Sequence, residues 1–244
     1  MARPSPRPIS MTPDIQGRIY SNDGNRLVLG RVAADAASVL DVGCGAGDNA
    51  LRLRQERPNV VLTGITLSGE EAAQAAGIMD AVHVADLTTC DFGFLRDTYD
   101  VAIFSHVLEH LPQPAEVVRK IAAHVRPGGT IIIAVPNIAF WKHRLKIAMG
   151  KFEYEQSGAF DSTHLRFYTW NTAEKHLIDP VPGLRLIAKV GGGSFPLRFL
   201  RRLMPGAWSA TIDRLAGRWR PNLFSDQVVL EAEVASAPDA AGAT

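Results

Sequence analysis

Three glycines at alternate positions, Gly43, Gly45 and Gly47, follow a short apolar run. Glycine suits a backbone that turns sharply and lies against a ligand, because it has no Cβ to occupy that space. The pattern predicts a strand, a tight loop and a helix, with Asp48 and Asn49 placed to cap the first amides of that helix. We therefore expect a nucleotide-like cofactor at the carboxyl end of the strand.

The spacing of these glycines distinguishes two kinds of cofactor site. Dinucleotide-binding folds use G-x-G-x-x-G, whereas this chain has G-x-G-x-G. The string VLDVGCGAGDNA, residues 39–50, closely resembles motif I of the class I S-adenosylmethionine-dependent methyltransferases. The resemblance implies a loop that wraps the methionine half of the cofactor, with Asp41 ordering the loop or the cofactor's amine. A glycine-rich turn that serves only chain geometry is the alternative.

Two later strand ends carry further expected cofactor contacts. The family usually ends its second strand with an acid that takes the ribose hydroxyls, but Thr66 stands there in GITLSGEE, which resembles the same stretch of cyclopropane-fatty-acid synthases. Asp86 matches the family's contact to the adenine amine, with Leu87 supplying a backbone amide, although a loop-capping Asp is the alternative. The full expected set is Asp41, Gly43, Cys44, Gly45, Gly47, Thr66, Leu67, Asp86, Leu87, Ser105 and His106.

The pentapeptide HVLEH contains His106, Glu109 and His110 and also fits the inverted zinc-protease pattern H-x-x-E-H. Two histidines at i and i+4 on a helix can share a metal, which leaves a zinc hydrolase as a remote alternative. Leu111 and Pro112 interrupt such a helix, so we expect no metal. The segment, with LPQPAEVVRKIAAHVRPGG after it, closely resembles ubiquinone-pathway O-methyltransferases and MetW-like proteins.

A hydroxyl that accepts a methyl group must lose its proton, and an imidazole with a pKa of about 6.5 can take it. We expect His110 to be this base, with His164 as the second candidate. The position of His110 resembles that of a histidine paired with an N-terminal tyrosine in phosphoethanolamine methyltransferases, a part that Tyr20 could play here. The alternative is that His110 only packs the turn before Pro112.

Two segments are expected to cover the site. Residues 138–170 resemble the lid insertion of MetW-like and natural-product methyltransferases, are rich in aromatic residues, and offer Asp161, His164 and Arg166 as polar candidates for a substrate pocket. These three could instead tie the lid to the domain. Residues 194–225 carry six arginines, which suit an anionic carrier or membrane surface; a solvated helix pair closing the pocket is the alternative.

The elements that must position these residues alternate along the chain. Helices are predicted over 25–37, 49–57, 69–76 and 115–125, and strands over 39–42, 60–67, 81–85, 99–104, 130–137, 184–190 and 227–234, the last antiparallel. This alternation predicts an α/β fold, and the resemblance implies a Rossmann-like, doubly wound sheet of seven strands, mostly parallel. We expect one domain over 25–235, a flexible segment over 1–24 and a disordered tail over 236–244.

Composition narrows the function classes. The 244 residues are 46% hydrophobic and carry a net charge of +1, so there is no global field to attract nucleic acid. Two cysteines give no disulfide framework, and no apolar run is long enough to span a bilayer, so we expect a cytoplasmic protein. The oligomeric state stays open.

The predicted function is methyl transfer from S-adenosylmethionine to a hydroxyl of a small molecule, such as a natural product, sugar or lipid-linked intermediate. An N- or C-methyltransferase and a MetW-like partner protein without activity of its own are the alternatives.

Overall fold

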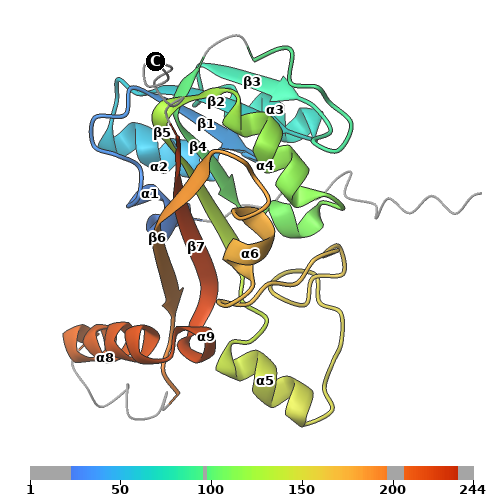
Figure 1. Ribbon diagram of the computed structural model, residues 1–244, viewed down its shortest axis with the longest axis vertical. Coiled ribbons are helices and arrows are strands. Elements are labelled where there is room, and N and C mark those ends of the chain that lie inside the picture. The colour runs from blue at the N-terminus through green and yellow to red at the C-terminus, as the bar shows by residue number, and fades with distance from the viewer. Residues whose placement is uncertain (1–22, 96–97, 197–205, 236–244) are drawn as a thin grey trace, which may run out of the picture.

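A seven-stranded sheet forms the centre of the computed structural model, which describes residues 23–95, 98–196 and 206–235 (Figure 1). The strands are β1 (Ser38–Val42), β2 (Val61–Thr66), β3 (Ala81–Val84), β4 (Tyr99–Ser105), β5 (Val125–Pro136), β6 (Leu184–Gly193) and β7 (Ser225–Val234). Their order across the sheet is β3-β2-β1-β4-β5-β7-β6.

The first five strands are parallel, and β7 lies antiparallel to both β5 and β6. The predicted doubly wound sheet with one antiparallel strand is therefore confirmed. The chain moves outward from β1 to β3 and then returns to place β4 on the other side of β1. This reversal makes the carboxyl ends of β1 and β4 the switch point, where ligands of open α/β sheets bind.

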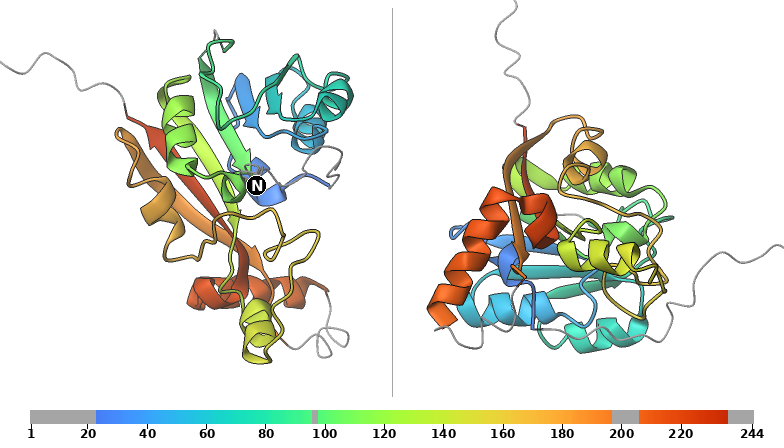
Figure 2. Two further views of the ribbon diagram at one scale, coloured as in Figure 1. Left: turned by 90° about the vertical axis from the view of Figure 1, so that its right-hand side faces the viewer. Right: turned by 90° about the horizontal axis from the view of Figure 1, so that it is seen from below.

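Helices cover both faces of the sheet (Figure 2). They are α1 (Arg26–Leu29), α2 (Asp48–Glu56), α3 (Gly69–Ala75), the 3₁₀ helix η1 (Leu108–His110), α4 (Pro114–Ala122), α5 (Trp141–Ala148), α6 (Ala173–Leu177), α8 (Gly206–Trp219) and α9 (Pro221–Phe224). One buried cluster joins the sheet to α4 and α6 through Ile121 and Leu177, and a second joins it to α1–α3 through Val28, Leu53 and Ala75.

Two local predictions are corrected. The first helix ends at Leu29 and does not reach residue 37, because Gly30 already closes it as the C-cap. Asp48 and Asn49 do not cap α2: the cap is Gly47, with φ 91°, and no side chain bonds its amides. The side chain of Asn49 instead accepts from the backbone amide of Asn25.

Asp100 fixes the start of β1 against β4. Its Oδ2 accepts from the amides of Ala37 and Ser38 at 2.8 and 2.9 Å, and its Oδ1 accepts from Arg126 at 2.5 Å. Burial alone would raise the pKa of this carboxyl, but these donors lower it to about 2. The two strands of the switch point are thereby held in register.

The later segments gather at the carboxyl end of β5, where α5, α8 and α9 lie beyond the sheet (Figure 1). Within the described ranges, no helix has the length and apolar character required to cross a membrane. Tyr20, Arg198, Arg201, Arg202 and residues 236–244 lie outside the described residues.

Candidate active site

The glycine loop after β1 adopts a backbone that glycine favours. Gly43, Gly45 and Gly47 have φ values of 78°, 54° and 91°. A Cβ on Gly43 would lie 2.3 Å from Cγ2 of Val107, in the segment that follows β4. At this position glycine is therefore required by protein packing, and the loop lies directly against residues 106–110.

Asp41 is the next-to-last residue of β1 and is only 3% exposed. Among the described residues, neither of its carboxylate oxygens has a hydrogen-bond partner. Burial raises its pKa to about 7. An unpaired carboxylate beside a cofactor loop is what a cationic amine or an ordered donor of a ligand would satisfy.

Thr66 does not stand alone at the end of β2. Its hydroxyl donates to Oε2 of Glu71 at 2.6 Å, and both residues are buried. Ser68 accepts from the amide of Glu71, but the Glu71 side chain does not return the bond and contacts Thr66 instead. A buried carboxylate from the first turn of α3 thus lies beside Thr66. This pairing was not predicted from the sequence.

Cys44 lies between the two acids. Burial first, and then the charges of Asp41 and Glu71, raise the pKa of its thiol. Its Sγ would be 2.7 Å from a Cβ on Gly64, so the floor of the loop is closely packed.

Asp86 follows β3 and is exposed. Its Oδ1 accepts from the amide and the hydroxyl of Thr88, at 2.8 and 2.7 Å, so the loop-capping geometry is present. Both bonds use one oxygen of the carboxylate. The side chain of Leu87 is buried in the core, whereas that of Leu67 is 48% exposed.

The backbone turns sharply at His106, immediately after β4. Its φ of 58° is rare for a residue with a side chain and marks local strain. Its Nε2 lies 3.1 Å from Oε1 of Gln227, which also accepts from Asn25 at 2.8 Å. The side-chain amide of Asn25 also donates to Oγ of Ser105, at 3.5 Å.

Glu109 is the most enclosed charged group of this region, with 1% of its side chain exposed. Its Oε1 lies 3.4 Å from Nδ1 of His106 and 4.0 Å from Nε2 of His164. The rings of His110 and His164 are in edge contact, with centroids 4.7 Å apart. Because η1 has only three residues, His106 and His110 do not share an α-helical face as the inverted zinc motif requires.

The imidazoles of His110 and His164 each have a defined partner at Nδ1. His110 Nδ1 is 2.9 Å from Oγ1 of Thr163, which donates to Oδ1 of Asp161 at 2.7 Å. His164 Nδ1 is 3.3 Å from the carbonyl oxygen of Ala159. Burial lowers the pKa of His164. For His106, burial would lower the pKa, but contact with the Glu109 carboxylate raises it above its usual value.

The polar residues predicted in segment 138–170 have different partners in the structure. Asp161 pairs with Thr163 and not with Arg166, which donates to the carbonyl of Pro112 at 2.5 Å. Arg166 therefore ties the lid to the loop before α4. The aromatic residues expected to line a pocket are divided: Phe140, Phe160 and Tyr168 are buried, while Phe152, Tyr154 and Phe167 are exposed.

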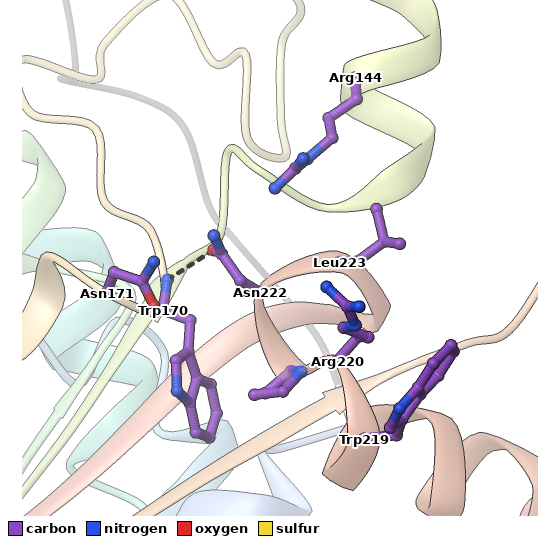
Figure 3. A pocket seen from close by; sticks show the side chains of 8 residues that line it. Arg144, Trp170, Asn171, Trp219, Arg220, Asn222 and Leu223 are labelled. Carbon is purple, nitrogen blue, oxygen red and sulfur yellow. Dashed lines mark hydrogen bonds between the residues drawn. The ribbon is translucent and has the colours of Figure 1, made fainter.

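A hollow of about 480 Å³ opens between α5, the segment before α6, and the junction of α8 with α9 (Figure 3). Its lining residues are Arg144, Trp170, Asn171, Trp219, Arg220, Pro221, Asn222 and Leu223. The guanidinium of Arg220 lies 5.2 Å from the Trp219 ring centre, and the amide of Trp170 donates to Asn222. The contribution of Arg144 was missed, because it lies far from the arginine-rich segment in sequence.

A family profile described as a methyltransferase domain matches residues 17–176. The chain belongs to this family. The predicted class I methyltransferase fold is confirmed, and the cofactor of this methyltransferase is S-adenosylmethionine.

Two curated relatives show how far the similarity extends. A ubiquinone biosynthesis O-methyltransferase of Sodalis glossinidius (strain morsitans) is 36% identical over 109 residues, 41% of either chain. A trans-aconitate 2-methyltransferase of Deinococcus radiodurans is 30% identical over 126 residues, 50% of this chain and 47% of the relative. The chain thus spans less than half the length of these relatives.

Solved structures share the fold of this methyltransferase. A SAM-dependent methyltransferase from Archaeoglobus fulgidus matches with a TM-score of 0.54 at 17% identity, covering 82% of this chain and 86% of that one. The [4+2]-cyclase SpnF matches with a TM-score of 0.55 at 20% identity, covering 86% and 80%. Because SpnF is a cyclase, this fold is not restricted to methyl transfer.

Asp41 predicts a specific dependence of stability on pH. The folded state holds its proton up to about pH 7, whereas an unfolded aspartate releases it near pH 4, so stability falls as pH rises between these values. Titration of Asp41 should lower the free energy of unfolding of the wild type by up to about 4 kcal/mol as pH rises. Asp41→Asn should lack this decrease and be more stable than the wild type at pH 8. Urea unfolding at pH 5 and pH 8 measures this difference.

The control is Asp179→Asn, at an exposed carboxylate just after α6. This variant should follow the wild type at both pH values. If Asp41→Asn also follows the wild type, the Asp41 carboxyl does not titrate as its burial implies.

Proposed function

We propose that the chain transfers the methyl group of S-adenosylmethionine to a hydroxyl oxygen of a small molecule. The observation that carries this proposal is the cluster that Glu109 and His110, in the segment after β4 at the switch point of the sheet, form with His164. The contact of Gly43 with Val107 puts this segment against the cofactor loop. A hydroxyl acceptor needs a group that handles its proton at this place.

The residues of the chain fit the cofactor. Gly45, with φ 54°, lets the loop backbone lie against the methionine half, and the unpaired carboxylate of Asp41 suits its amine. Thr66 and Glu71 together supply the polar group for the ribose, and Asp86 accepts from the adenine amine. Because the sulfonium of the cofactor is already a strong electrophile, the chain need only bind, align and remove a proton.

His110 is our first candidate to handle the proton, as the sequence suggested. Thr163 gives its single hydroxyl proton to Asp161, so His110 must donate to Thr163 through Nδ1 and keeps its lone pair on Nε2. A proton taken from the acceptor would go to Nε2, while Nδ1 stays bonded to Thr163. Tyr20, the suggested second member, is outside the described residues, and His164 is the alternative base.

The relatives support oxygen as the acceptor atom only in part. One is named an O-methyltransferase, but the similarity covers 41% of either chain, and the substrate of this chain is not carried over from it. An amine that is already neutral attacks through its own lone pair, whereas a hydroxyl must lose its proton, so the cluster favours the hydroxyl over a neutral amine. A cytoplasmic location and a small-molecule acceptor stay predictions.

We further propose that the hollow beside Trp170 binds an anionic group of the acceptor or its carrier. Two arginines from distant segments, Arg144 and Arg220, line it together with two tryptophans. Guanidinium groups match phosphate and carboxylate geometry, and aromatic rings bind an apolar portion of the same molecule.

The cofactor assignment predicts a set of binding changes measurable by calorimetry. Gly45→Val should abolish binding of S-adenosylmethionine, because a side chain would occupy cofactor space at a positive φ. Glu71→Gln and Asp86→Asn should each weaken binding by about 1–3 kcal/mol through loss of a charge-assisted bond. Glu70→Gln, at the exposed neighbour of Glu71, is the matched control and should bind as the wild type does. Binding of NAD in place of S-adenosylmethionine would contradict the assignment.

Methyl transfer itself is tested by incubating the protein with labelled cofactor and fractionated cell extract and identifying the labelled product. We expect the label on an oxygen. His110→Ala should lower turnover about 100-fold, the usual contribution of general acid–base catalysis, with unchanged cofactor affinity. His176→Ala, at an exposed histidine of α6, should retain turnover. A label on nitrogen or carbon would exclude the proposed acceptor atom.

Once an acceptor is found, Arg220→Glu tests the hollow. Reversing this charge should raise the KM for an anionic acceptor at least tenfold, whereas the affinity for the cofactor should stay the same. Arg214→Glu is the matched control, because Arg214 belongs to the same basic segment and is exposed but does not line the hollow. If both charge reversals raised the KM equally, the effect would come from the overall charge of the segment and not from a specific anion site.

A further inference from the structure

The carboxylate of Glu109 is buried, and Nδ1 of His106, 3.4 Å from Oε1, contacts it from one side. Its side chain is 1% exposed, and among the described residues neither oxygen has a hydrogen-bond partner. One ligand atom each of Glu109, His110 and His164 lies within 4.8 Å of the others. Buried carboxylates are normally paired, so this cluster requires an explanation.

The hydrogen bonds around the two imidazoles determine which nitrogen of each ring carries a lone pair. A backbone carbonyl only accepts, so the contact with Ala159 places the proton of a neutral His164 on Nδ1. The bond from Thr163 to Asp161 does the same for His110, as described above. Both rings therefore present an unprotonated Nε2, and their Nδ1 atoms are held by acceptors.

Among Glu109, His110 and His164 the facing atoms are therefore all electron-pair donors, while His106 contacts Oε1 of Glu109 at 3.4 Å from outside this set. Nε2 of His164 faces Oε1 of Glu109 at 4.0 Å, too long for a hydrogen bond between them. Two such atoms repel each other unless a positive charge lies between them. Histidines whose Nδ1 donates to a carbonyl or to a hydroxyl–carboxylate pair are the usual arrangement of metal-binding imidazoles.

We propose that Glu109, His110 and His164 bind a divalent transition-metal cation. Two imidazoles and one carboxylate suit Zn²⁺, Mn²⁺ or Fe²⁺ better than Mg²⁺ or Ca²⁺, which prefer oxygen ligands. Metal–ligand distances of about 2.0–2.2 Å require the three atoms to approach by a fraction of their present separation, which side-chain rotation provides. The ligand set differs from the inverted zinc motif, since His164 of the lid replaces His106.

This site also gives the lid a chemical role. The carbonyl oxygen of Glu109 accepts from the amides of Leu165 and Arg166, at 2.8 and 3.0 Å, so the lid backbone is docked where its histidine joins the cluster. A bound cation leaves positions open for a hydroxyl and lowers the pKa of that hydroxyl, so that its proton leaves more easily. In that form His110 acts as a ligand and no longer as the direct base. This consequence for catalysis rests on the proposed function, whereas the binding site itself does not.

The test is calorimetric titration of the chelator-treated full chain with Zn²⁺, Mn²⁺ and Mg²⁺, without cofactor or acceptor. We expect one Zn²⁺ or Mn²⁺ per chain and at least tenfold weaker binding of Mg²⁺. Glu109→Gln and His164→Ala should each weaken binding at least 100-fold. Thr163→Val should weaken it 10- to 100-fold and Thr163→Ser should restore it, because only the hydroxyl orients His110. His176→Ala is the control and should bind as the wild type does.

Co²⁺ provides a second measurement, since its visible absorption reports the ligand field. The spectrum should change when Glu109→Gln replaces the wild type and should not change with His176→Ala. Absence of stoichiometric Zn²⁺ or Mn²⁺ binding by the folded wild type would overturn the proposal, as would binding that survives both Glu109→Gln and His164→Ala. Metal binding without methyl transfer would retain this site and refute only the proposed function.

Discussion

One residue joins the sheet, the lid and the polar cluster: Glu109. Its backbone carbonyl holds the amides of Leu165 and Arg166, and its carboxylate lies among the imidazoles of His106 and His164. If the Glu109 side chain were removed, its backbone contact with Leu165 and Arg166 would remain. If that backbone contact were lost, His164 would no longer be held beside the Glu109 carboxylate. The geometry of the candidate active site therefore depends on both the backbone carbonyl and the side chain of Glu109. The short helix η1 suits this role because its few residues leave backbone groups free for the lid.

The sheet topology explains why unpaired acids are found where they are. Asp41 lies near the end of β1 and Glu109 follows the end of β4, and these two strands are neighbours at the switch point. Elsewhere in the described chain, strand acids such as Asp100 are saturated by amides and by arginine. The carboxylates of Asp41 and Glu109, both buried, thus lie at the edge of the sheet where ligands of open α/β folds bind.

Much of this arrangement could be predicted from local sequence. The alternation of apolar runs and helices gives the sheet, and the glycines with Asp41 give the cofactor loop, because these patterns act over a few neighbouring residues. The pairing of Thr66 with Glu71 could not be found so easily, since Glu71 also fits a capping box and only the packed α3 decides between them. The capping prediction for Asp48 and Asn49 failed for the same reason: Asn25 takes the Asn49 side chain through a contact 24 residues away.

The cluster itself is a product of tertiary structure. Thr163 and His110 are separated by 53 positions, and nothing in either segment alone indicates that one sets the tautomer of the other. The motif HVLEH contains His106, whose Nδ1 lies 3.4 Å from Oε1 of Glu109, but it does not indicate that His164 also lies near this oxygen, at 4.0 Å. His106 is 40% exposed and contacts Gln227 of β7, whereas His164 is 6% exposed. Because the lid carries His164 and is docked by Glu109, a displaced lid would disassemble the cluster. The arrangement of this cluster thus depends on contacts between two distant segments, a link that no single motif of the sequence contains.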